Sequence, residues 1–229
     1  MKKVLLCAVV ACLATLPAMG GTVLTIGTAD PGSGNCFPFG CAYNAEYQQI
    51  YNQTDFSGPI QITDLSLYNT QYNSGATQTD AGTFTISLST SPKNINNVSG
   101  AFAQNIGGDN TQVFSGSINQ SWNFGDTLNI HFTTPFNYDP SKGSLLIDVT
   151  GTGVSTPGGA IYYDVDSTQQ LFSRVYCSGG VACGQNGTVQ TDYGWVTGLT
   201  YNSVPEPGTL VMLGTGLLGA VGVIRRRIL

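Results

Sequence analysis

The stretch GTFTISLS, residues 82–89, alternates apolar side chains with hydroxyl-bearing ones after its first glycine. Phe84, Ile86 and Leu88 occupy every second position, so an extended backbone places all three on one face. A period of two over this length predicts a β-strand with one buried face and one polar face. The stretch therefore indicates a sheet that packs against another layer.

The same pattern recurs between the two ends of the chain. Residues 125–132 and 144–150 alternate in the same way, and residues 60–67 do so with a phase slip beside Asp64 that predicts a β-bulge. Weaker strand signals, bounded by Gly, Asn, Asp or Pro, cover residues 23–28, 46–51, 111–118, 160–165, 170–176 and 195–201. About nine or ten short one-face-apolar strands predict an all-β fold: an antiparallel β-sandwich, jelly-roll-like in type.

The charge of the chain limits its partners. Only 9% of the 229 residues are charged, whereas soluble domains average about 25%. Residues 21–203 carry three basic side chains against twelve acidic ones, a net charge of −9. A nucleic-acid-binding protein needs a basic patch to neutralise phosphates, so we expect no nucleic acid partner.

The first 20 residues have the three zones of a secretory signal peptide. Two lysines are followed by the uncharged apolar run 4–16 and by small residues that end at Gly20. We therefore expect a signal peptidase to remove residues 1–20. One alternative is a membrane anchor, for which the apolar run is short. The other is a lipoprotein, for which Cys12 lies too early, in the middle of the apolar zone.

The last 26 residues, 204–229, also have three parts. Val204-Pro205-Glu206-Pro207 is followed by an uncharged, Gly-rich stretch, residues 208–224, and then by Arg225, Arg226 and Arg227. A helix over residues 208–224 measures about 25 Å, close to the lower limit for crossing a membrane. Because positive charge stays cytoplasmic, the arginines orient this predicted transmembrane helix with the preceding domain outside. The prolines keep the backbone extended, as a protease or transpeptidase requires of its substrate.

This tail resembles the PEP-CTERM sorting signal. Pro205-Glu206-Pro207 correspond to its motif, residues 208–224 to its membrane span, and the three arginines to its basic end. The resemblance implies a bacterial exosortase, an integral-membrane cysteine protease or transpeptidase that cuts near the motif and sends the domain to the cell surface. It also implies an association with exopolysaccharide and biofilm. The alternative, an ordinary C-terminal anchor, leaves the two prolines around a glutamate unexplained.

Four cysteines lie in the predicted exported domain, and an even number in an exported chain predicts two disulfides. Three connectivities are open. We favour the local pairs Cys36–Cys41 and Cys177–Cys183, because each pair brackets a turn-like segment. The competing interpretation, a metal site, is opposed by the spacings, which are not C-x-x-C, and by the oxidising compartment.

Candidate catalytic residues are few. His131 is the one histidine, and it shares the polar face of its strand with Asn129, which favours a surface role over a catalytic base. The chain has no G-x-S-x-G, H-E-x-x-H or phosphate-loop motif. A carboxylate pair for glycoside hydrolysis rests on Asp164 and Asp166, because Glu46 is the one glutamate between residues 21 and 203. We therefore expect a protein that is not an enzyme, with hydrolase activity as a distant alternative.

Four aspartates carry the oxygen ligands that Ca²⁺ prefers: Asp139, Asp148, Asp164 and Asp166. They do not form a D-x-D-x-D-G loop. We therefore expect no metal and no cofactor, and structural calcium stays open as an alternative.

Aromatic side chains offer flat, rigid surfaces on which sugar rings can stack. Trp195 and Tyr201 are the candidates for glycan contact. Tyr162 and Tyr163 are neighbours on a predicted strand and face opposite sides, so at most one of them belongs to such a surface. The competing interpretation is that most of these rings pack in the core.

These observations predict three segments. Residues 1–20 are a signal peptide, residues 21–203 an exported β-sandwich domain, and residues 204–229 a sorting segment. The expected partners are signal peptidase, exosortase, exopolysaccharide and, transiently, the inner membrane, with the C-terminus in the cytoplasm before release to the cell surface or beyond. We expect a non-catalytic surface or extracellular-matrix protein. The alternative is a carbohydrate-binding β-sandwich module on the cell surface.

Overall fold

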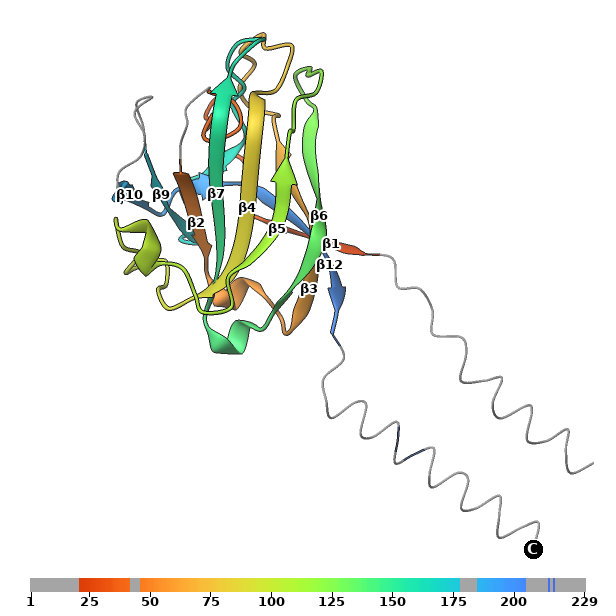
Figure 1. Ribbon diagram of the computed structural model, residues 1–229, viewed down its shortest axis with the longest axis vertical. Coiled ribbons are helices and arrows are strands. Elements are labelled where there is room, and N and C mark those ends of the chain that lie inside the picture. The colour runs from red at the N-terminus through yellow and green to blue at the C-terminus, as the bar shows by residue number, and fades with distance from the viewer. Residues whose placement is uncertain (1–20, 42–45, 178–184, 205–213, 215, 217–229) are drawn as a thin grey trace, which may run out of the picture.

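The computed structural model describes residues 21–41, 46–177, 185–204, 214 and 216. Their strands pair antiparallel in two packed layers (Figure 1), which confirms the predicted antiparallel β-sandwich. The predicted signal peptide, and all of residues 208–224 except Gly214 and Gly216, lie outside the described residues. Within the described part of the chain, no helix is long and apolar enough to cross a membrane.

The layers are a four-stranded and a six-stranded sheet. In spatial order, the smaller sheet consists of β1 (Thr22–Ile26), β12 (Thr197–Ser203), β3 (Ile60–Tyr68) and β6 (Thr127–Tyr138). The larger sheet consists of β10 (Thr188–Thr191), β9 (Phe172–Tyr176), β2 (Glu46–Tyr51), β7 (Ser144–Ser155), β4 (Ala81–Ser91) and β5 (Thr111–Gly116). A short ribbon pairs β11 (Gly194–Trp195) with β8 (Val165–Asp166). Three 3-10 turns are η1 (Gln53–Asp55), η2 (Phe102–Gln104) and η3 (Pro140–Lys142).

The alternation in the sequence places the core between the two sheets. Phe84, Ile86 and Leu88 of β4 are fully buried in the main hydrophobic cluster. In β7, Leu145 and Ile147 join the same cluster. Each buried aliphatic or aromatic side chain contributes about 1.5–3 kcal/mol to folding, so this two-residue period is the main source of the sandwich's stability.

The outer face of the six-stranded sheet is covered by the connection between β4 and β5. Ile95 of this connection packs against Ile50 and Leu146 in a second, smaller hydrophobic cluster. Gln48 of β2 donates from its Nε2 to the Phe102 carbonyl at 3.2 Å. Strand β2 is therefore buried on both faces, a feature that its weak alternation in the sequence does not reveal.

The predicted bulge beside Asp64 is confirmed. On one side of β3, Ile62 pairs with Phe136 whereas Asp64 pairs with His131, so β6 carries extra residues between these two pairs. On its other side, β3 shifts register against β12 between Thr200 and Tyr201. A bulge re-aims the side chains beyond it, and this one keeps the following leucines of β3 in the core.

The predicted strand over residues 160–165 is wrong for most of its length. Of these residues only the last lies in a strand, β8. Tyr163 forms an isolated bridge with Asn35, and the Ile161 N–H donates to the Gly40 carbonyl at 3.0 Å. The segment has the apolar alternation of a strand, but its backbone partners belong to connections and not to a sheet. Strand β10, in turn, was not predicted.

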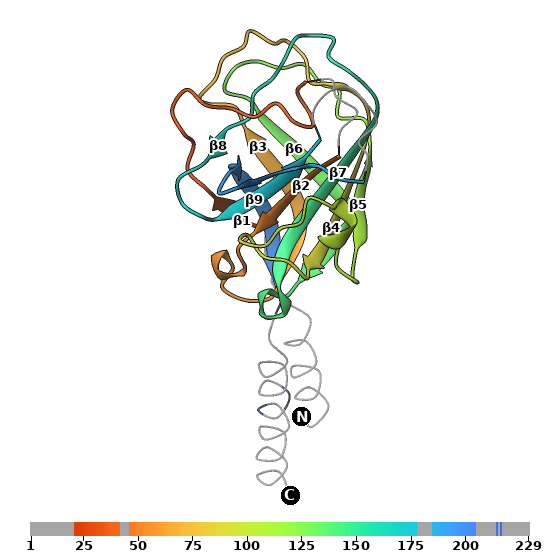
Figure 2. The same ribbon diagram turned by 90° about the vertical axis from the view of Figure 1, so that its left-hand side faces the viewer.

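Both ends of the described domain lie at the same end of the sandwich, which we call the base (Figure 2). Thr22 at the start of β1 pairs with Tyr201 near the end of β12, and the Val204 N–H donates to the Pro59 carbonyl at 3.3 Å. We call the opposite end the tip. It consists of the connections 27–41, 69–80, 117–126 and 156–164, which hydrogen-bond to one another.

Candidate functional site

The predicted disulfide between Cys36 and Cys41 is confirmed, with the two Cα atoms 5.2 Å apart. It closes a short loop in the first connection of the tip. Cys177 is also disulfide-bonded. Cys183, its predicted partner, lies outside the described residues.

Trp195 does not lie at the surface, so its predicted glycan contact requires correction. Its side chain is fully buried, and its ring stacks on Tyr47 at 4.1 Å between centroids and on Phe39 at 5.8 Å. Its indole Nε1 donates to the Phe37 carbonyl at 3.0 Å. The competing interpretation, core packing, is the one that the structure supports for this residue.

Tyr201, the second candidate for glycan contact, is partly buried in β12 and packs against the main hydrophobic cluster. A glycan contact of its exposed part stays a prediction. As expected for neighbours with opposite orientations, Tyr163 is fully buried while Tyr162 is partly exposed. Tyr162 lies beside Tyr72, with 4.7 Å between ring centroids. The aromatic pair at the surface is therefore at the tip and does not include Trp195.

Asp164 and Asp166 are buried and organise connections at the tip. Asp164 accepts hydrogen bonds from the Thr70 N–H at 2.8 Å, the Thr70 hydroxyl at 2.7 Å and the Gln71 N–H at 3.1 Å. Asp166 accepts from the Thr28 N–H at 2.7 Å and from a second threonine, Thr168, through both its N–H and its hydroxyl. Both carboxylates thus hold backbone donors of the protein itself, which is a structural role.

The other two aspartates considered for calcium lie elsewhere. Asp139 is the N-cap of η3, and hydrogen bonds from Ser141 lower the pKa of its carboxyl below the usual value. Asp148 lies on the outer face of β7 opposite Gln48. No group of three or more His, Cys, Asp or Glu side chains within the described ranges is placed to hold a metal ion. The structure therefore does not bring these four carboxylates together.

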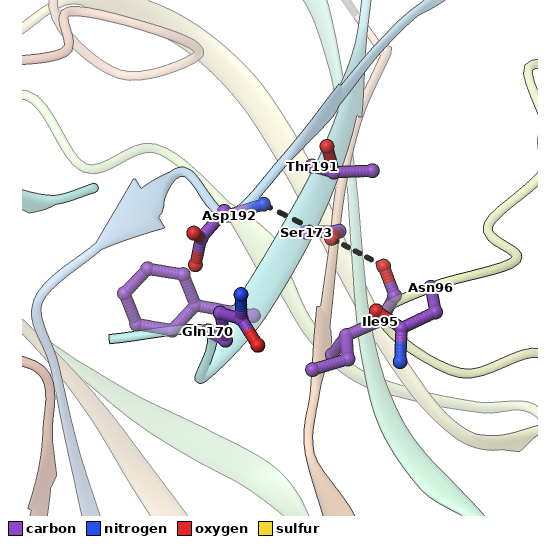
Figure 3. A pocket seen from close by; sticks show the side chains of 7 residues that line it. Ile95, Asn96, Gln170, Ser173, Thr191 and Asp192 are labelled. Atoms are coloured by element: carbon purple, nitrogen blue, oxygen red, sulfur yellow. Dashed lines mark hydrogen bonds between the residues drawn. The ribbon is translucent and has the colours of Figure 1, made fainter. Parts of the chain in front are cut away.

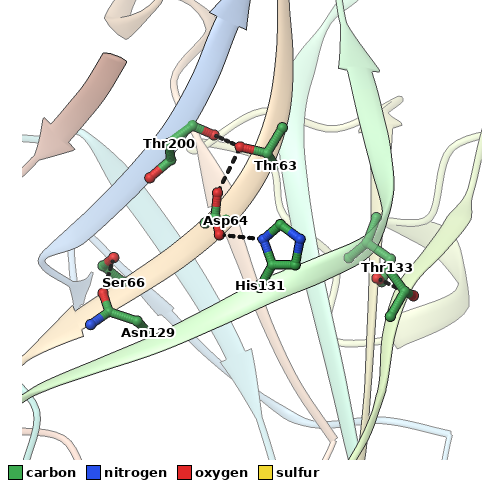
Figure 4. A network of polar contacts seen from close by, with 8 residues as sticks. Thr63, Asp64, Ser66, Asn129, His131, Thr133 and Thr200 are labelled. Carbon is green, nitrogen blue, oxygen red and sulfur yellow. Dashed lines mark hydrogen bonds and ion pairs between the residues drawn. The ribbon is translucent and has the colours of Figure 1, made fainter. Parts of the chain in front are cut away.

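His131 lies on the exposed face of β6, as its alternation predicts (Figure 4). Its Nδ1 lies 2.7 Å from the Asp64 carboxylate, whose other oxygen accepts from the Thr63 hydroxyl at 2.7 Å. The histidine side chain is 80% exposed. In a Ser-His-Asp site, a hydroxyl faces the second ring nitrogen; here the hydroxyl lies on the far side of the carboxylate. The three groups Thr63, Asp64 and His131 therefore do not have the order of a Ser-His-Asp site.

Sequence reasoning did not identify a pair of carboxyl groups on the outer face of the six-stranded sheet. Burial raises the pKa of Glu46 to about 7, with the nearby charge of Asp148 as the second cause. Burial likewise raises the pKa of Asp148 to about 6. Glu46 borders a hollow of about 420 Å³ beside Phe102 and Ile106. The pairing of β2 with β7 brings the two acids together, so a local sequence pattern gives no signal for it.

From the raised pKa values of these two acids we predict that the protein becomes less stable as the pH rises. Because both folded-state pKa values exceed the ordinary ones, the folded protein binds protons more tightly than the unfolded chain. The resulting stability is complete below about pH 4 and is lost as the pH rises through about 6 and 7. Thermal unfolding between pH 4 and 8 should show a falling melting temperature.

The variants Glu46→Gln and Asp148→Asn should each raise the melting temperature at pH 8 and flatten this dependence. Asp55, whose pKa burial raises to about 6, titrates with the same sign and leaves a residual slope. A melting temperature that rises steadily toward pH 8 in the unmodified chain would contradict the prediction.

A small cavity of about 150 Å³ lies where β9 meets the β4–β5 connection (Figure 3). The Ser173 hydroxyl donates to the Ile95 carbonyl at 2.6 Å and accepts from the Asp192 N–H at 3.3 Å. Gln170 and Asp192 on its wall have positive φ, 52° and 58°, a conformation that costs a non-glycine residue about 1 kcal/mol or more. These bonds fasten the covering connection to β9, the strand next to the edge strand β10.

The predicted sorting segment begins where the sandwich ends. Ser203 is the last residue of β12 and pairs with Ile60 at the base, and Val204 follows it. Pro205, Glu206 and Pro207, together with Arg225, Arg226 and Arg227, lie outside the described residues. The segment thus leaves the folded domain directly from the end of a central strand of the four-stranded sheet.

Comparison with known proteins identifies this segment. No curated protein matches the chain. Residues 203–227 match the family model described as the PEP-CTERM protein-sorting motif. The chain thus carries the PEP-CTERM sorting motif from the last residue of its β-sandwich onward, which supports an exported protein that an exosortase processes.

Proposed function

We propose that the mature protein is a non-catalytic component of the cell surface or extracellular matrix, associated with exopolysaccharide or biofilm. A signal peptidase removes residues 1–20. Residues 208–224 then hold the chain in the inner membrane, with Arg225–Arg227 on the cytoplasmic side, until an exosortase cuts near Pro205-Glu206-Pro207. The observation that carries the proposal is the match at residues 203–227, which starts at the last residue of β12.

The geometry of the described domain favours a role without catalysis. The exposed His131 has an acid partner, and the hydroxyl of Thr63 bonds to the far oxygen of that acid and not to the ring. The buried carboxylates of Asp164 and Asp166 hold backbone N–H groups and threonine hydroxyls. We expect no glycoside-hydrolase or esterase activity from the unmodified protein. If such activity were found, its loss in His131→Ala would show that it depends on His131.

Replacing Pro205-Glu206-Pro207 by three alanines tests the sorting step. We expect processing to stop and the uncut precursor to accumulate in the membrane fraction, because the enzyme loses the extended segment that it recognises. Mass spectrometry of the unmodified mature protein should show a chain that begins at Gly21 and lacks Arg225–Leu229. The matched control Val189→Ala, at an exposed position of β10, should be processed normally.

Two results would contradict the proposal. The first is mature protein that still carries Arg225–Leu229, which is the behaviour of a plain C-terminal anchor. The second is unchanged processing of the triple-alanine variant, which would mean that the cut does not depend on the motif.

A further inference from the structure

Three connections of the tip, which carry Tyr72, Tyr162 and Phe124, are joined through one buried asparagine. The Asn69 Nδ2 donates to the Tyr72 carbonyl at 3.0 Å and to the Tyr162 carbonyl at 2.6 Å. The Asn69 carbonyl accepts at 2.9 Å from the N–H of Gly125, the residue after Phe124. Tyr72 is 43% exposed and Phe124 is 47% exposed. The rings of Tyr72 and Tyr162 lie 4.7 Å apart between centroids and form one surface.

The backbone under these rings is firmly held. Asp164 accepts three hydrogen bonds from Thr70 and Gln71, immediately before Tyr72. Ser74, two residues after Tyr72, donates its hydroxyl to the Ala160 carbonyl. The aromatic surface is therefore ordered before any ligand arrives, which reduces the entropy that binding must overcome.

The two tyrosine rings are inclined to one another by 57°. Successive sugar rings of a polysaccharide are also rotated relative to one another, so two inclined faces can each stack on one sugar. The tyrosine hydroxyls and the exposed side chain of Asn73, next to Tyr72 in the chain, supply hydrogen-bonding groups around these faces. Flat apolar faces bordered by uncharged donors and acceptors suit a polyhydroxylated ring.

The lack of basic side chains at the tip favours an uncharged polymer as the ligand. The segments 69–80, 117–126 and 156–164 contain no Lys, Arg or His, and residues 21–203 carry a net charge of −9. Nucleic acids, anionic polysaccharides and anionic lipid surfaces are repelled by such a domain. The tip also lies opposite Gly21 and Val204 at the base, so it points away from a membrane that holds the C-terminal segment.

We propose that the tip is a binding site for a neutral polysaccharide, with Tyr72 and Tyr162 as the stacking faces. This inference rests on the proposed surface location, and it adds a ligand class and the residues that bind it. It also replaces Trp195, which is buried, with an aromatic surface that a polymer can reach.

Affinity electrophoresis of the detergent-purified full chain in native gels tests the site. The gels contain hydroxyethyl cellulose, galactomannan or dextran as neutral probes, and polygalacturonate as the anionic comparison. We expect retardation by at least one neutral probe and none by polygalacturonate. Tyr72→Ala and Tyr162→Ala should each weaken binding about tenfold, the loss of one stacked ring. Tyr72→Phe, which keeps the ring, should retain most of the affinity, and Val23→Ala at the base should retain all of it.

The remaining outcomes overturn the proposal. They are migration unaffected by all three neutral probes, equal retardation of Tyr72→Ala and the unmodified chain, and Tyr72-dependent flotation with neutral phosphatidylcholine vesicles. Circular dichroism confirms that each variant is folded. C-terminal processing of Tyr72→Ala in cells separates the two proposals: a variant that is cut normally while the unmodified chain binds no probe removes the polysaccharide site and leaves the sorting function standing.

Discussion

Replacing Trp195 by alanine is expected to destabilise the domain by about 3–5 kcal/mol, the range for removing a buried aromatic side chain. The ring is fully enclosed and stacks on Tyr47 and Phe39. Its loss also leaves the Phe37 carbonyl without the indole N–H. Because whole domains are stable by only about 5–15 kcal/mol, this one change removes a large part of the total. Equilibrium unfolding in urea measures the loss.

Two variants make this test specific. Trp195→Phe keeps a stacked ring and loses the indole hydrogen bond, so it should cost about 1–2 kcal/mol. Val189→Ala, at an exposed position, should change stability by less than about 0.5 kcal/mol. A Trp195→Ala protein with unchanged unfolding would show that the stacked ring does not contribute to the stability of the domain.

This prediction changes how glycan-binding data on Trp195 must be interpreted. A loss of binding in Trp195→Ala would follow from partial unfolding of the domain, and it would not identify a contact. Tyr72 and Tyr162 can be replaced without opening the core, because both rings lie at the surface of the tip.

Asp164→Ala is the second change with a large expected effect. The substitution removes the acceptor of three hydrogen bonds, from the Thr70 N–H, the Thr70 hydroxyl and the Gln71 N–H. Donors left without partners cost about 1–3 kcal/mol each where they are buried. Since water reaches some of them here, we expect a total loss of about 2–4 kcal/mol. Denaturation in urea gives this value.

Amide hydrogen exchange locates the damage. The N–H groups of Thr70 and Gln71 should exchange faster in Asp164→Ala, while those of the base should not change at temperatures where the protein stays folded. Asp139→Ala is the matched control, because this partly exposed aspartate also accepts bonds from a neighbouring turn, at Ser141, and its loss should destabilise the domain far less. Equal losses in the two variants would contradict the role of Asp164.

The strands were predictable where one face is buried and the other is exposed to solvent. In β4 the order of the side chains alone placed Phe84, Ile86 and Leu88 in the core. For β2, whose bounds were predicted, the pattern did not reveal that both faces are covered. For residues 160–165 the predicted strand was mostly wrong, because their apolar period reflects contact with connections at the tip. Alternation reports which face is buried; it does not report whether the backbone pairs with a strand.

Of the functional features, those that depend on local sequence order were predictable and those that depend on contacts between distant residues were not. The sorting segment was predictable because proline, a membrane-length apolar run and arginines act through their local order. The surface aromatic pair was not, because Tyr72 and Tyr162 are far apart in sequence and meet through Asn69. The burial of Trp195 is connected with the preceding residue, Gly194. A Cβ at this position would lie 2.6 Å from the Gln49 Oε1, so the core closely encloses the backbone here.

The position of β12 between β1 and β3 has a mechanical consequence. A force that is applied at the tip and resisted at Val204 acts along the axis of β12, which lies between the two strands to which it is hydrogen-bonded. The cross-strand hydrogen bonds, which are perpendicular to the strands, are then loaded in shear and must rupture together rather than one after another. A domain connected in this way can carry tension between a cell and the material around it.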